Sequence, residues 1–350
     1  MLWKSADSLW KIVRLHRIIF ADVYGRAERV NENLLIEVRH LKKYFKVPAG
    51  VNHAVDDVSF TISRGETLGV VGESGCGKST LGRNIIRLQE PTDGEILLGG
   101  QDVSHLSGRA LKKVREKMQI VFQDPYSSLN PRKTIESTVM EPLKNSGRFT
   151  SKSEMQDEAE RLMELVGIDE RLRRSYPHEL DGGRRQRVCI ARALALNPEF
   201  IVCDEPVSAL DVSIQAQVLN LLMDLQEQMG MAYMFVTHDL SVVRHISNSV
   251  CVMYLGQLVE KSETEELFET QYHPYTKALL SAIPSVDLKN QTKRITLRGE
   301  ITSPINPKPG CRFAARCPYA KEECSQPQVL EEVSPGHYVQ CCRVREINAL

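Results

Sequence analysis

The glycine-rich segment Gly72-Glu-Ser-Gly-Cys-Gly-Lys-Ser79 has the spacing of a loop that binds phosphate groups. Gly75 and Gly77 let successive backbone N–H groups turn inward around a phosphate chain, and a helix after the loop adds its positive N-terminus. Lys78 can reach the β- and γ-phosphates, while the hydroxyl of Ser79 can coordinate Mg²⁺. We therefore expect a nucleoside triphosphate to bind at Gly72, Glu73, Ser74, Gly75, Cys76, Gly77, Lys78, Ser79 and Thr80.

An acidic pair, Asp204 and Glu205, follows a short apolar run at residues 200–203. A carboxylate at the C-terminal end of a buried strand meets Mg²⁺ above the sheet, which is the role expected for Asp204. The adjacent Glu205 can polarise an attacking water molecule. Without the phosphate loop, a solvated strand end would be a substantial alternative for such a pair. With the loop, it predicts hydrolysis of the nucleotide as well as binding.

Alternating strands and helices must position these residues. Short apolar runs at 67–71, 200–203 and 232–236 are typical of buried parallel strands, and the first of them leads into the phosphate loop. A long helix is expected over 211–230, where apolar residues recur on one face. Residues 34–38 alternate as in an edge strand. The pattern predicts an α/β fold with a mainly parallel sheet.

A helical stretch from about 130 to 190 separates two halves of the expected sheet, so we expect an inserted helical lobe. Within it Ser151 and Glu154 have the spacing of a capping box, and Gly167 ends the helix that they begin. After about residue 265 the composition shifts to proline, cysteine and charged residues. This shift predicts a separate C-terminal module over residues 266–350.

The composition excludes several classes of protein. The chain has 350 residues, with 45 Lys and Arg against 45 Asp and Glu, so its formal net charge is zero. A protein built to coat nucleic acid carries a basic excess, so no nucleic-acid partner is expected. No apolar run reaches the ~18–20 residues of a membrane-spanning helix, and no secretory signal is recognisable. The length exceeds that of most single cores, which predicts more than one lobe.

Residues 1–33 form a basic amphipathic extension, in which Trp3, Trp10 and Phe20 recur near helical spacing. Such a helix can lie on an anionic membrane surface or on a partner protein. It can equally pack on its own domain, or be a loose tail added by an upstream start codon. Both interpretations stay open.

From about residue 34 to 265 the chain resembles the ATP-binding subunit of an ABC transporter. The resemblance rests on motifs in the family's order: the phosphate loop, Gln123 in Val-Phe-Gln-Asp-Pro, Gly182-Gly183, the acidic pair, Ser208-Ala-Leu-Asp211, and His238 in Val-Thr-His-Asp. It implies a P-loop ABC-type nucleotide-binding domain over 34–265. Such a domain has a RecA-like core, an antiparallel β subdomain and an inserted helical subdomain.

The resemblance also implies roles for single residues. Gln123 would contact Mg²⁺ and the attacking water and report to the membrane subunit, while His238 would hold the γ-phosphate. With Glu205 they form the expected catalytic group. The expected Mg²⁺ ligands are Ser79, Gln123 and Asp204.

Two more residues receive roles from the resemblance alone. Asp211 would lie at the interface of an ATPase dimer. Tyr44, upstream of the phosphate loop, would stack on adenine. A lone tyrosine or aspartate is usually structural, so these roles depend on the order and spacing of the whole motif set.

Three segments narrow the resemblance to the dipeptide/oligopeptide importer branch: residues 122–132, His273-Pro-Tyr-Thr-Lys-Ala-Leu-Leu280, and Gly310-Cys-Arg-Phe-Ala-Ala-Arg-Cys-Pro-Tyr-Ala. Tyr126, in Asp-Pro-Tyr, is closer to the branch's second, F-type ATPase subunit than to the first. The resemblance implies a peripheral ATPase on the cytoplasmic face of the cell membrane. It would pair with a second, similar ATPase as a heterodimer.

The implied heterodimer would power import of dipeptides or oligopeptides through two transmembrane permease subunits. An extracytoplasmic binding protein would select the cargo. The same role in a nickel or oligosaccharide importer is an alternative within the class. A soluble regulatory or ribosome-associated ABC ATPase, or a non-hydrolytic ATP-binding partner, is an alternative from outside it.

Five of the nine cysteines fall near the C-terminus. Cys311, Cys317, Cys324 and Cys341 are spaced too widely for the C-x-x-C of a structural zinc site, and four thiolates suit a [4Fe–4S] cluster. The importer branch that the chain resembles carries such a cluster here. Zinc is the alternative metal, and Cys342 is a rival for the fourth position. We expect the metal to hold a small Cys-rich module together.

One motif departs from the family. The loop that usually reads Leu-Ser-Gly-Gly-Gln reads Leu180-Asp181-Gly182-Gly183-Arg184 here. In the family it faces the γ-phosphate bound to the partner subunit. An ionised Asp181 cannot donate a hydrogen bond, and at ~4 Å it would repel a unit negative charge by roughly 4 kcal/mol.

Asp181 would also cap its own helix and so occupy the anion-binding position from within. Our hypothesis is that the composite site receiving Asp181 is impaired, while the site built on this chain's own phosphate loop hydrolyses ATP. The alternative is that Asp181 is tolerated because the glycine N–H groups bind the phosphate.

Overall fold

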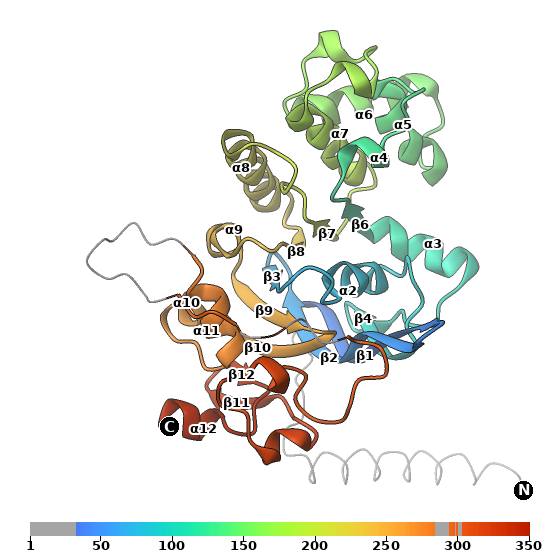
Figure 1. The fold of residues 1–350 in the computed structure, drawn as a ribbon. Coiled ribbons are helices and arrows are strands. Elements are labelled where there is room, and N and C mark those ends of the chain that lie inside the picture. The colour runs from blue at the N-terminus through green and yellow to red at the C-terminus, as the bar shows by residue number, and fades with distance from the viewer. Residues whose placement is uncertain (1–32, 284–293, 298, 300–302) are drawn as a thin grey trace, which may run out of the picture.

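Figure 1 shows the computed structural model, which describes residues 33–283, 294–297, 299 and 303–350. The basic extension predicted for the N-terminus lies, except for Asn33, outside the described residues. Within the described part, no helix combines the length and apolar character that crossing a bilayer requires.

The large sheet is the centre of the fold. In the described part of the chain it has the strand order β11-β12-β10-β9-β3-β8-β7-β6. Neighbours from β9 to β6 run parallel, whereas β10, β12 and β11 are added antiparallel at one edge. The predicted mainly parallel sheet is confirmed. Its strands are β3 (Thr67–Val71), β6 (Met118–Val121), β7 (Phe200–Asp204), β8 (Ala232–Val236), β9 (Ser249–Tyr254), β10 (Gln257–Glu263), β11 (Glu331–Ser334) and β12 (His337–Val339).

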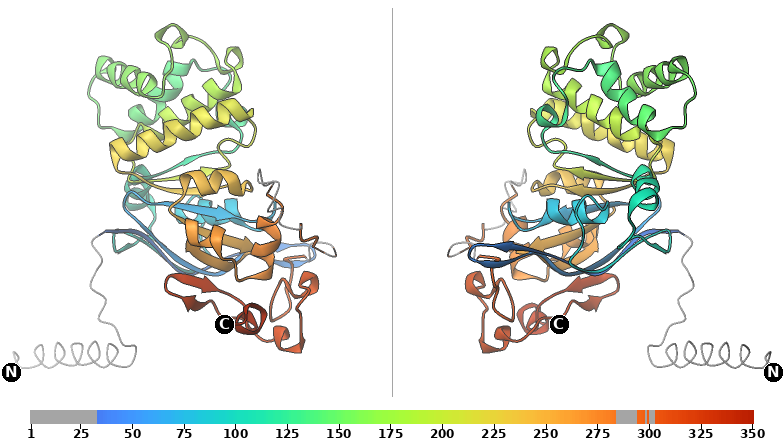
Figure 2. Two further views of the ribbon diagram at one scale, coloured as in Figure 1. Left: turned by 90° about the vertical axis from the view of Figure 1, so that its left-hand side faces the viewer. Right: turned by 90° about the vertical axis from the view of Figure 1, so that its right-hand side faces the viewer.

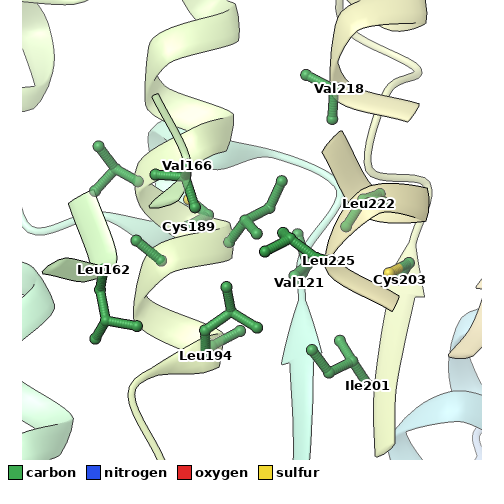
Figure 3. Close-up of a cluster of buried hydrophobic side chains, with 14 of the residues drawn as sticks. Val121, Leu162, Val166, Cys189, Leu194, Ile201, Cys203, Val218, Leu222 and Leu225 are labelled. Atoms are coloured by element: carbon green, nitrogen blue, oxygen red, sulfur yellow. The ribbon is translucent and has the colours of Figure 1, made fainter. Parts of the chain in front are cut away.

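Successive residues of the parallel strands face two different cores. Ile201 of β7 packs with the helices α7 (Gly182–Leu194) and α8 (Val212–Met229), as Figure 3 shows. The next residue, Val202, packs on the other side with α2 (Lys78–Ile85) and the small sheet. A fully buried aliphatic side chain stabilises the fold by about 1.5–3 kcal/mol. Because these strands are buried on both faces, their carboxyl ends are held firmly, and the site residues lie at these ends.

The small sheet is antiparallel, with the order β2-β1-β4-β5. Its strands are β1 (Leu34–Val47), β2 (Gly50–Ser63), β4 (Asp93–Leu98) and β5 (Gln101–Asp102). The prediction of an edge strand at the start of β1 is wrong, because β1 lies between β2 and β4. Its apolar residues alternate because one face of this sheet is buried against α2.

A helical lobe is inserted between β6 and β7, which are parallel neighbours. It contains α4 (Pro125–Ser128), α5 (Ile135–Ser146), α6 (Lys152–Leu165) and α7, with two 3-10 turns, η1 (Glu170–Leu172) and η2 (Pro177–Glu179). The predicted capping box is confirmed: the Ser151 hydroxyl accepts a hydrogen bond from the N–H of Glu154 over 3.0 Å. Figures 1 and 2 show the lobe at the opposite end of the protein from the C-terminus.

The remaining helices connect the strands of the large sheet. α3 (Gly108–Lys117) leads into β6, and α9 (Leu240–Ile246) follows β8. The helix predicted over 211–230 is confirmed as α8. Asp211 is its N-cap, accepting the N–H of Ile214 over 3.0 Å, and Gly230 ends it with a φ of 66°.

The chain after β10 continues the large sheet. Glu260 pairs with Val339 and Lys261 with Tyr338, so the hairpin of β11 and β12 covers the edge of β10. The helices here are short: α10 (Thr264–Glu269), α11 (Pro274–Leu280), η3 (Ala314–Arg316), η4 (Glu322–Ser325) and α12 (Val344–Asn348).

The C-terminal residues were predicted to form a separate module. Instead, Tyr275 and Phe313 belong to the same hydrophobic core as Val71 and Val252 of the large sheet. The high content of proline and charged residues in this region reflects its loops. Backbone pairing with β10 joins the region to the sheet, and the composition of a sequence does not reveal such pairing. The prediction of a separate module is therefore corrected.

Candidate functional site

The phosphate loop runs from the end of β3 to the start of α2, as the sequence predicted. Gly72, Gly75 and Gly77 have positive φ angles of 152°, 77° and 107°. A Cβ atom on Gly77 would come within 2.0 Å of the carbonyl oxygen of Ala54, and one on Gly72 within 2.2 Å of that of Met253. Both positions therefore require glycine for a steric as well as a conformational reason.

Lys78 folds back over the loop that precedes it. Its Nζ donates hydrogen bonds to the carbonyl oxygens of Gly72, over 2.8 Å, and Glu73, over 3.1 Å. The N-cap of α2 is Gly77, which brings no side chain to cap the helix. The N–H groups at the start of α2 are consequently free to bind a ligand, and the positive partial charge of the helix N-terminus favours an anion there. Cys76 is buried, which raises the pKa of its thiol, in keeping with a small spacer.

A cavity of about 540 Å³ opens beside this loop. Its lining brings together predicted residues from four separate parts of the sequence. The residues that line it are Phe45, Asn52, Ala54, Ser74, Gly75, Gly77, Lys78, Ser79, Thr80, Gln123, Glu205 and His238. The size and the cationic, N–H-rich lining suit a nucleotide's phosphate chain.

Two of the lining residues converge on the carboxylate of a third. The side-chain amide of Gln123 donates to Oε2 of Glu205 over 2.9 Å, and Nδ1 of His238 lies 3.3 Å from the same oxygen. They follow β6, β7 and β8, whose carboxyl ends lie side by side. Glu205 has a φ of 48° and its N–H is bonded to the carbonyl of Val236 over 2.9 Å, which holds the carboxylate at the cavity. The expected catalytic group is thus assembled.

Asp204 lies behind the cavity, next to the phosphate loop. The hydroxyl of Ser79 donates to its Oδ1 over 2.6 Å, and a guanidinium nitrogen of Arg83 lies 3.5 Å from Oδ2. Asp204 is 1% exposed. A buried carboxylate beside a hydroxyl offers the oxygen donors that Mg²⁺ prefers.

The residue expected to stack on adenine does not face the cavity. Tyr44 does not line the cavity: its ring stacks on that of His53, with 4.0 Å between centroids, and its hydroxyl donates to Asp56. Phe45 lines the cavity instead. Successive side chains of a strand point to opposite faces of the sheet, so an aromatic residue one position away from the correct one points away from the cavity. The alternation along β1 was the signal that could have identified Phe45.

The loop of Asp181 lies at the start of α7, away from the cavity lining. Oδ1 of Asp181 accepts the N–H of Arg184 over 2.7 Å, and Oδ2 lies 3.3 Å from its guanidinium. Asp181 is therefore the N-cap of α7, as predicted. A Cβ on Gly183 would approach Ile214 of α8 within 2.5 Å, so Gly183 allows close packing of α7 on α8.

The cysteines expected to bind metal lie near one another. The N–H of Cys311 donates to the carbonyl of Cys324 over 2.8 Å. Burial, followed by the neighbouring thiols of Cys341, Cys324 and Cys317, raises the pKa of Cys311 to about 12. Yet among the described residues no group of three or more His, Cys, Asp or Glu side chains is arranged to hold a metal ion. The structure therefore does not support the predicted cluster.

Comparison with known proteins adds two family matches. Residues 55–208 match the family described as ABC transporter, and residues 259–324 match the C-terminal region of oligopeptide/dipeptide transporters. The chain is 51% identical over 323 residues to the oligopeptide transport ATP-binding protein AppF of Bacillus subtilis, covering 89% of this chain and 98% of AppF. It is 48% identical over 323 residues to the dipeptide transport ATP-binding protein DppF of Haemophilus influenzae, covering 90% and 98%.

Solved structures show the same fold. The dimeric ATP-binding cassette MJ0796, bound to ADP and Pi, superposes with a TM-score of 0.61 at 31% identity, covering 66% of this chain and 99% of that one. CbiO1 from Clostridium perfringens, part of the transporter complex CbiONQ, has a TM-score of 0.61 at 28% identity, covering 69% and 92%.

Proposed function

Because the chain belongs to the ATP-binding subunits of ABC transporters, in the branch that powers oligopeptide and dipeptide import, we propose that its phosphate-loop cavity binds the ATP it hydrolyses. The observation that carries this assignment is the convergence of Gln123 and His238 on Glu205 at the open side of the loop. A carboxylate held in this way is suited to act on a water molecule that attacks a bound γ-phosphate.

Binding relies on groups already in place. Backbone N–H groups between Gly75 and Ser79 surround the phosphate chain, and Lys78 exchanges its carbonyl partners for phosphate oxygens. Phe45 offers a ring for adenine at the other end of the cavity. The remaining predicted residues of the loop act by shaping its backbone.

The residues present fit a magnesium ion. Ser79 and Asp204 supply oxygen donors 2.6 Å apart, and the side-chain oxygen of Gln123 would add a third. Held there, Mg²⁺ would supply positive charge against the charge that builds up on the phosphates. Ser79 orients its oxygen by its bond to Asp204, and Glu205 remains free to accept the proton of the attacking water.

We infer that the chain works in a dimer with a second ATPase subunit, on the cytoplasmic face of the membrane and against two permease subunits. The loop of Asp181 and the N-cap Asp211 lie outside this chain's own cavity, as expected of groups that complete a partner's site. The ATP-binding cassette MJ0796 is dimeric in its solved structure, which supports pairing in this fold. A binding protein outside the membrane would deliver the peptide.

The state of the second composite site follows from Asp181. Its side chain already accepts the Arg184 N–H at the helix terminus where a serine would face the partner's γ-phosphate. We propose that ATP turnover is slow in the site that receives this carboxylate. The site built on Glu205 and this chain's own phosphate loop carries the fast turnover.

We also propose that Cys311, Cys317, Cys324 and Cys341 hold a [4Fe–4S] cluster, with zinc as the competing metal. What supports it is the chemistry of four neighbouring thiols. The described thiols are not arranged as a metal site, so they would have to move onto the cluster. Iron and acid-labile sulfide found by analysis of protein purified without oxygen would support the cluster. Zinc, or no metal, would refute it.

The proposed assembly is tested by affinity purification of the full chain from its native membrane. We expect two permease subunits, a second ATPase and a peptide-binding protein to be recovered together. A nickel- or oligosaccharide-binding protein in their place would reassign the cargo. Recovery of the chain alone, or with ribosomes, would favour the soluble ATPase.

A further inference from the structure

Two segments that follow the nucleotide-binding domain in sequence contact the phosphate loop. Glu73, the second residue of the loop, donates its N–H to the hydroxyl oxygen of Tyr275 over 2.9 Å. Its carboxylate accepts two hydrogen bonds from the guanidinium of Arg316, over 2.7 Å and 3.1 Å. The motifs that carry Tyr275 and Arg316 have no part in the catalytic roles derived above, so this contact calls for its own explanation.

Arg316 is firmly held. Its side chain is 8% exposed, against 24% for that of Glu73. Its guanidinium lies 5.9 Å from the ring centroid of Tyr254, and that ring is in edge contact with the rings of Tyr275 and Phe313. A planar guanidinium that makes a two-pronged contact and lies against a ring is preorganised. The pair is therefore a rigid link and not a mobile surface ion pair.

The link has an electrostatic consequence for ATP. Glu73 places a carboxylate in a loop whose ligand is a polyanion, and an unpaired carboxylate there would repel the phosphates. Arg316 neutralises it. The carbonyl oxygen of Glu73 also accepts a hydrogen bond from Nζ of Lys78 over 3.1 Å, so one residue joins Arg316 to the phosphate-binding lysine.

The same segment makes a second contact, close in sequence to another lining residue of the cavity. Arg312 donates to the carbonyl of Leu255 and to the carboxylate of Asp56. That carboxylate also accepts the hydroxyl of Tyr44, which directly precedes the cavity residue Phe45. Two arginines of one short C-terminal segment thus reach residues next to the cavity lining: Arg316 contacts Glu73, which precedes Ser74, and Arg312 contacts Asp56, the partner of Tyr44.

We propose that Arg316 is a positioning residue for ATP: it acts through Glu73 to hold the phosphate loop in its binding conformation and to neutralise the loop's own negative charge. The C-terminal region thereby sets the affinity of the subunit for ATP. This inference rests on the proposed assignment of the cavity to ATP. Since Arg316 does not touch Glu205, it acts on binding and leaves the chemical step alone.

The test measures affinity of the full chain for a non-hydrolysable ATP analogue with Mg²⁺, by calorimetric titration. We expect Arg316→Gln to weaken binding about tenfold, and Arg316→Lys, which keeps the charge but loses the two-pronged contact, about threefold. Adding Glu73→Gln to Arg316→Gln removes the unpaired carboxylate and should recover most of the lost affinity. In the assembled transporter the KM for ATP should rise while kcat stays within about twofold.

Arg343→Gln is the matched control. Arg343 is another buried arginine of the C-terminal region, but its contacts with Glu346 and Tyr319 lie away from the phosphate loop. We expect this variant to lower the melting temperature without changing nucleotide affinity. If Arg343→Gln weakened binding as much as Arg316→Gln, the effect would be general destabilisation and the proposal would fail.

Two further results would overturn the proposal. One is wild-type affinity in both Arg316→Gln and Arg316→Lys. The other is a double variant that binds as weakly as Arg316→Gln alone, since this would give Arg316 a packing role only. A wild-type chain that binds no nucleotide would instead contradict the assignment of the cavity, and this inference with it.

Discussion

The side-chain amide of Gln123 donates a hydrogen bond to the carboxylate of Glu205 over 2.9 Å, although 82 positions separate them in the sequence. Gln123 follows β6 and Glu205 follows β7, and the chain between these strands forms the helical lobe. The bond therefore joins the point at which the chain leaves the sheet for the lobe to the C-terminal end of β7, the strand by which the chain returns. A movement of the lobe that displaces Gln123 would therefore also disturb the carboxylate of Glu205.

The first prediction concerns this bond. Gln123→Ala should lower kcat for ATP about 10- to 100-fold, because a misplaced base loses its alignment with water. The affinity for ATP should fall much less, because Ser79 and Asp204 still offer oxygen donors to Mg²⁺. The measurement is phosphate release by the assembled transporter. Gln119→Ala is the control, since Gln119 lies on β6, the strand that precedes Gln123, and its side-chain amide donates to the carbonyl of Arg115. Equal losses in both variants would contradict a specific role for Gln123.

The second prediction separates two adjacent aromatic residues. Phe45→Ala should weaken ATP binding about 3- to 10-fold through loss of stacking on adenine. Tyr44→Phe removes only the hydroxyl that donates to Asp56, so binding should change less than about twofold. Titration with a fluorescent ATP analogue measures both. The reverse order of effects would restore Tyr44 as the stacking residue.

The third prediction concerns the loop at the start of α7. Asp181→Ser should raise the ATPase rate of the assembled complex about two- to tenfold. Such an increase requires the activation barrier to fall by only ~0.4–1.4 kcal/mol, which is well below the expected repulsion of ~4 kcal/mol between Asp181 and the γ-phosphate. Asp169→Ser is the control, since Asp169 also caps a helical turn of the lobe. An unchanged or lower rate in Asp181→Ser would refute an impaired site.

The fourth prediction concerns pH and the C-terminal hairpin. His337 is buried between Glu260 and Glu266, at 2.8 Å and 3.1 Å. Burial disfavours its charged form, but the hydrogen bonds and charges of the two glutamates outweigh burial and raise the pKa of His337 above 6.5. Protonated His337 therefore stabilises the fold fully below pH 6.5, and this contribution is lost as the pH rises through the raised pKa.

His337→Asn should cost about 3 kcal/mol at pH ~6, because it leaves Glu260 buried without its partner. The difference from wild type should shrink as the pH rises to about 9. Urea unfolding at several pH values measures it. Burial lowers the pKa of His273 to about 4, so the stability that His273 contributes is lost as the pH falls below 6.5, which is the opposite trend. This contribution is common to wild type and His337→Asn, and it cancels when the two are compared. A difference independent of pH would contradict the protonated pair.

The sequence predicted the parts of the site that depend on local spacing. The phosphate loop, Asp204 and Glu205 each carry their chemistry in a few consecutive residues, and the structure places them as expected. Gln123 and His238, which contact Glu205, were identified only through the family resemblance. The structure then supplied the reason, since both follow strands that neighbour the strand of Glu205.

The sequence failed where the answer depends on pairing between distant segments. The choice between Tyr44 and Phe45 depends on which face of β1 meets the loop, and the attachment of β12 to β10 depends on backbone bonds that composition does not show. The contact of Arg316 with Glu73 spans 243 positions. No local sequence pattern predicts such a bond, because the two residues meet only once the C-terminal region has folded onto the sheet.

The most direct test of the central claim is peptide uptake by the transporter reconstituted in liposomes with MgATP and the binding protein, comparing wild type with Glu205→Gln. The variant should still bind ATP, but hydrolysis should fall about 10²–10⁴-fold and uptake should stop. Glu199→Gln, a control carboxylate that pairs with Arg64 and Lys117 away from the cavity, should transport normally. Undiminished hydrolysis and uptake with Glu205→Gln would contradict this chain's role as the ATPase that drives import.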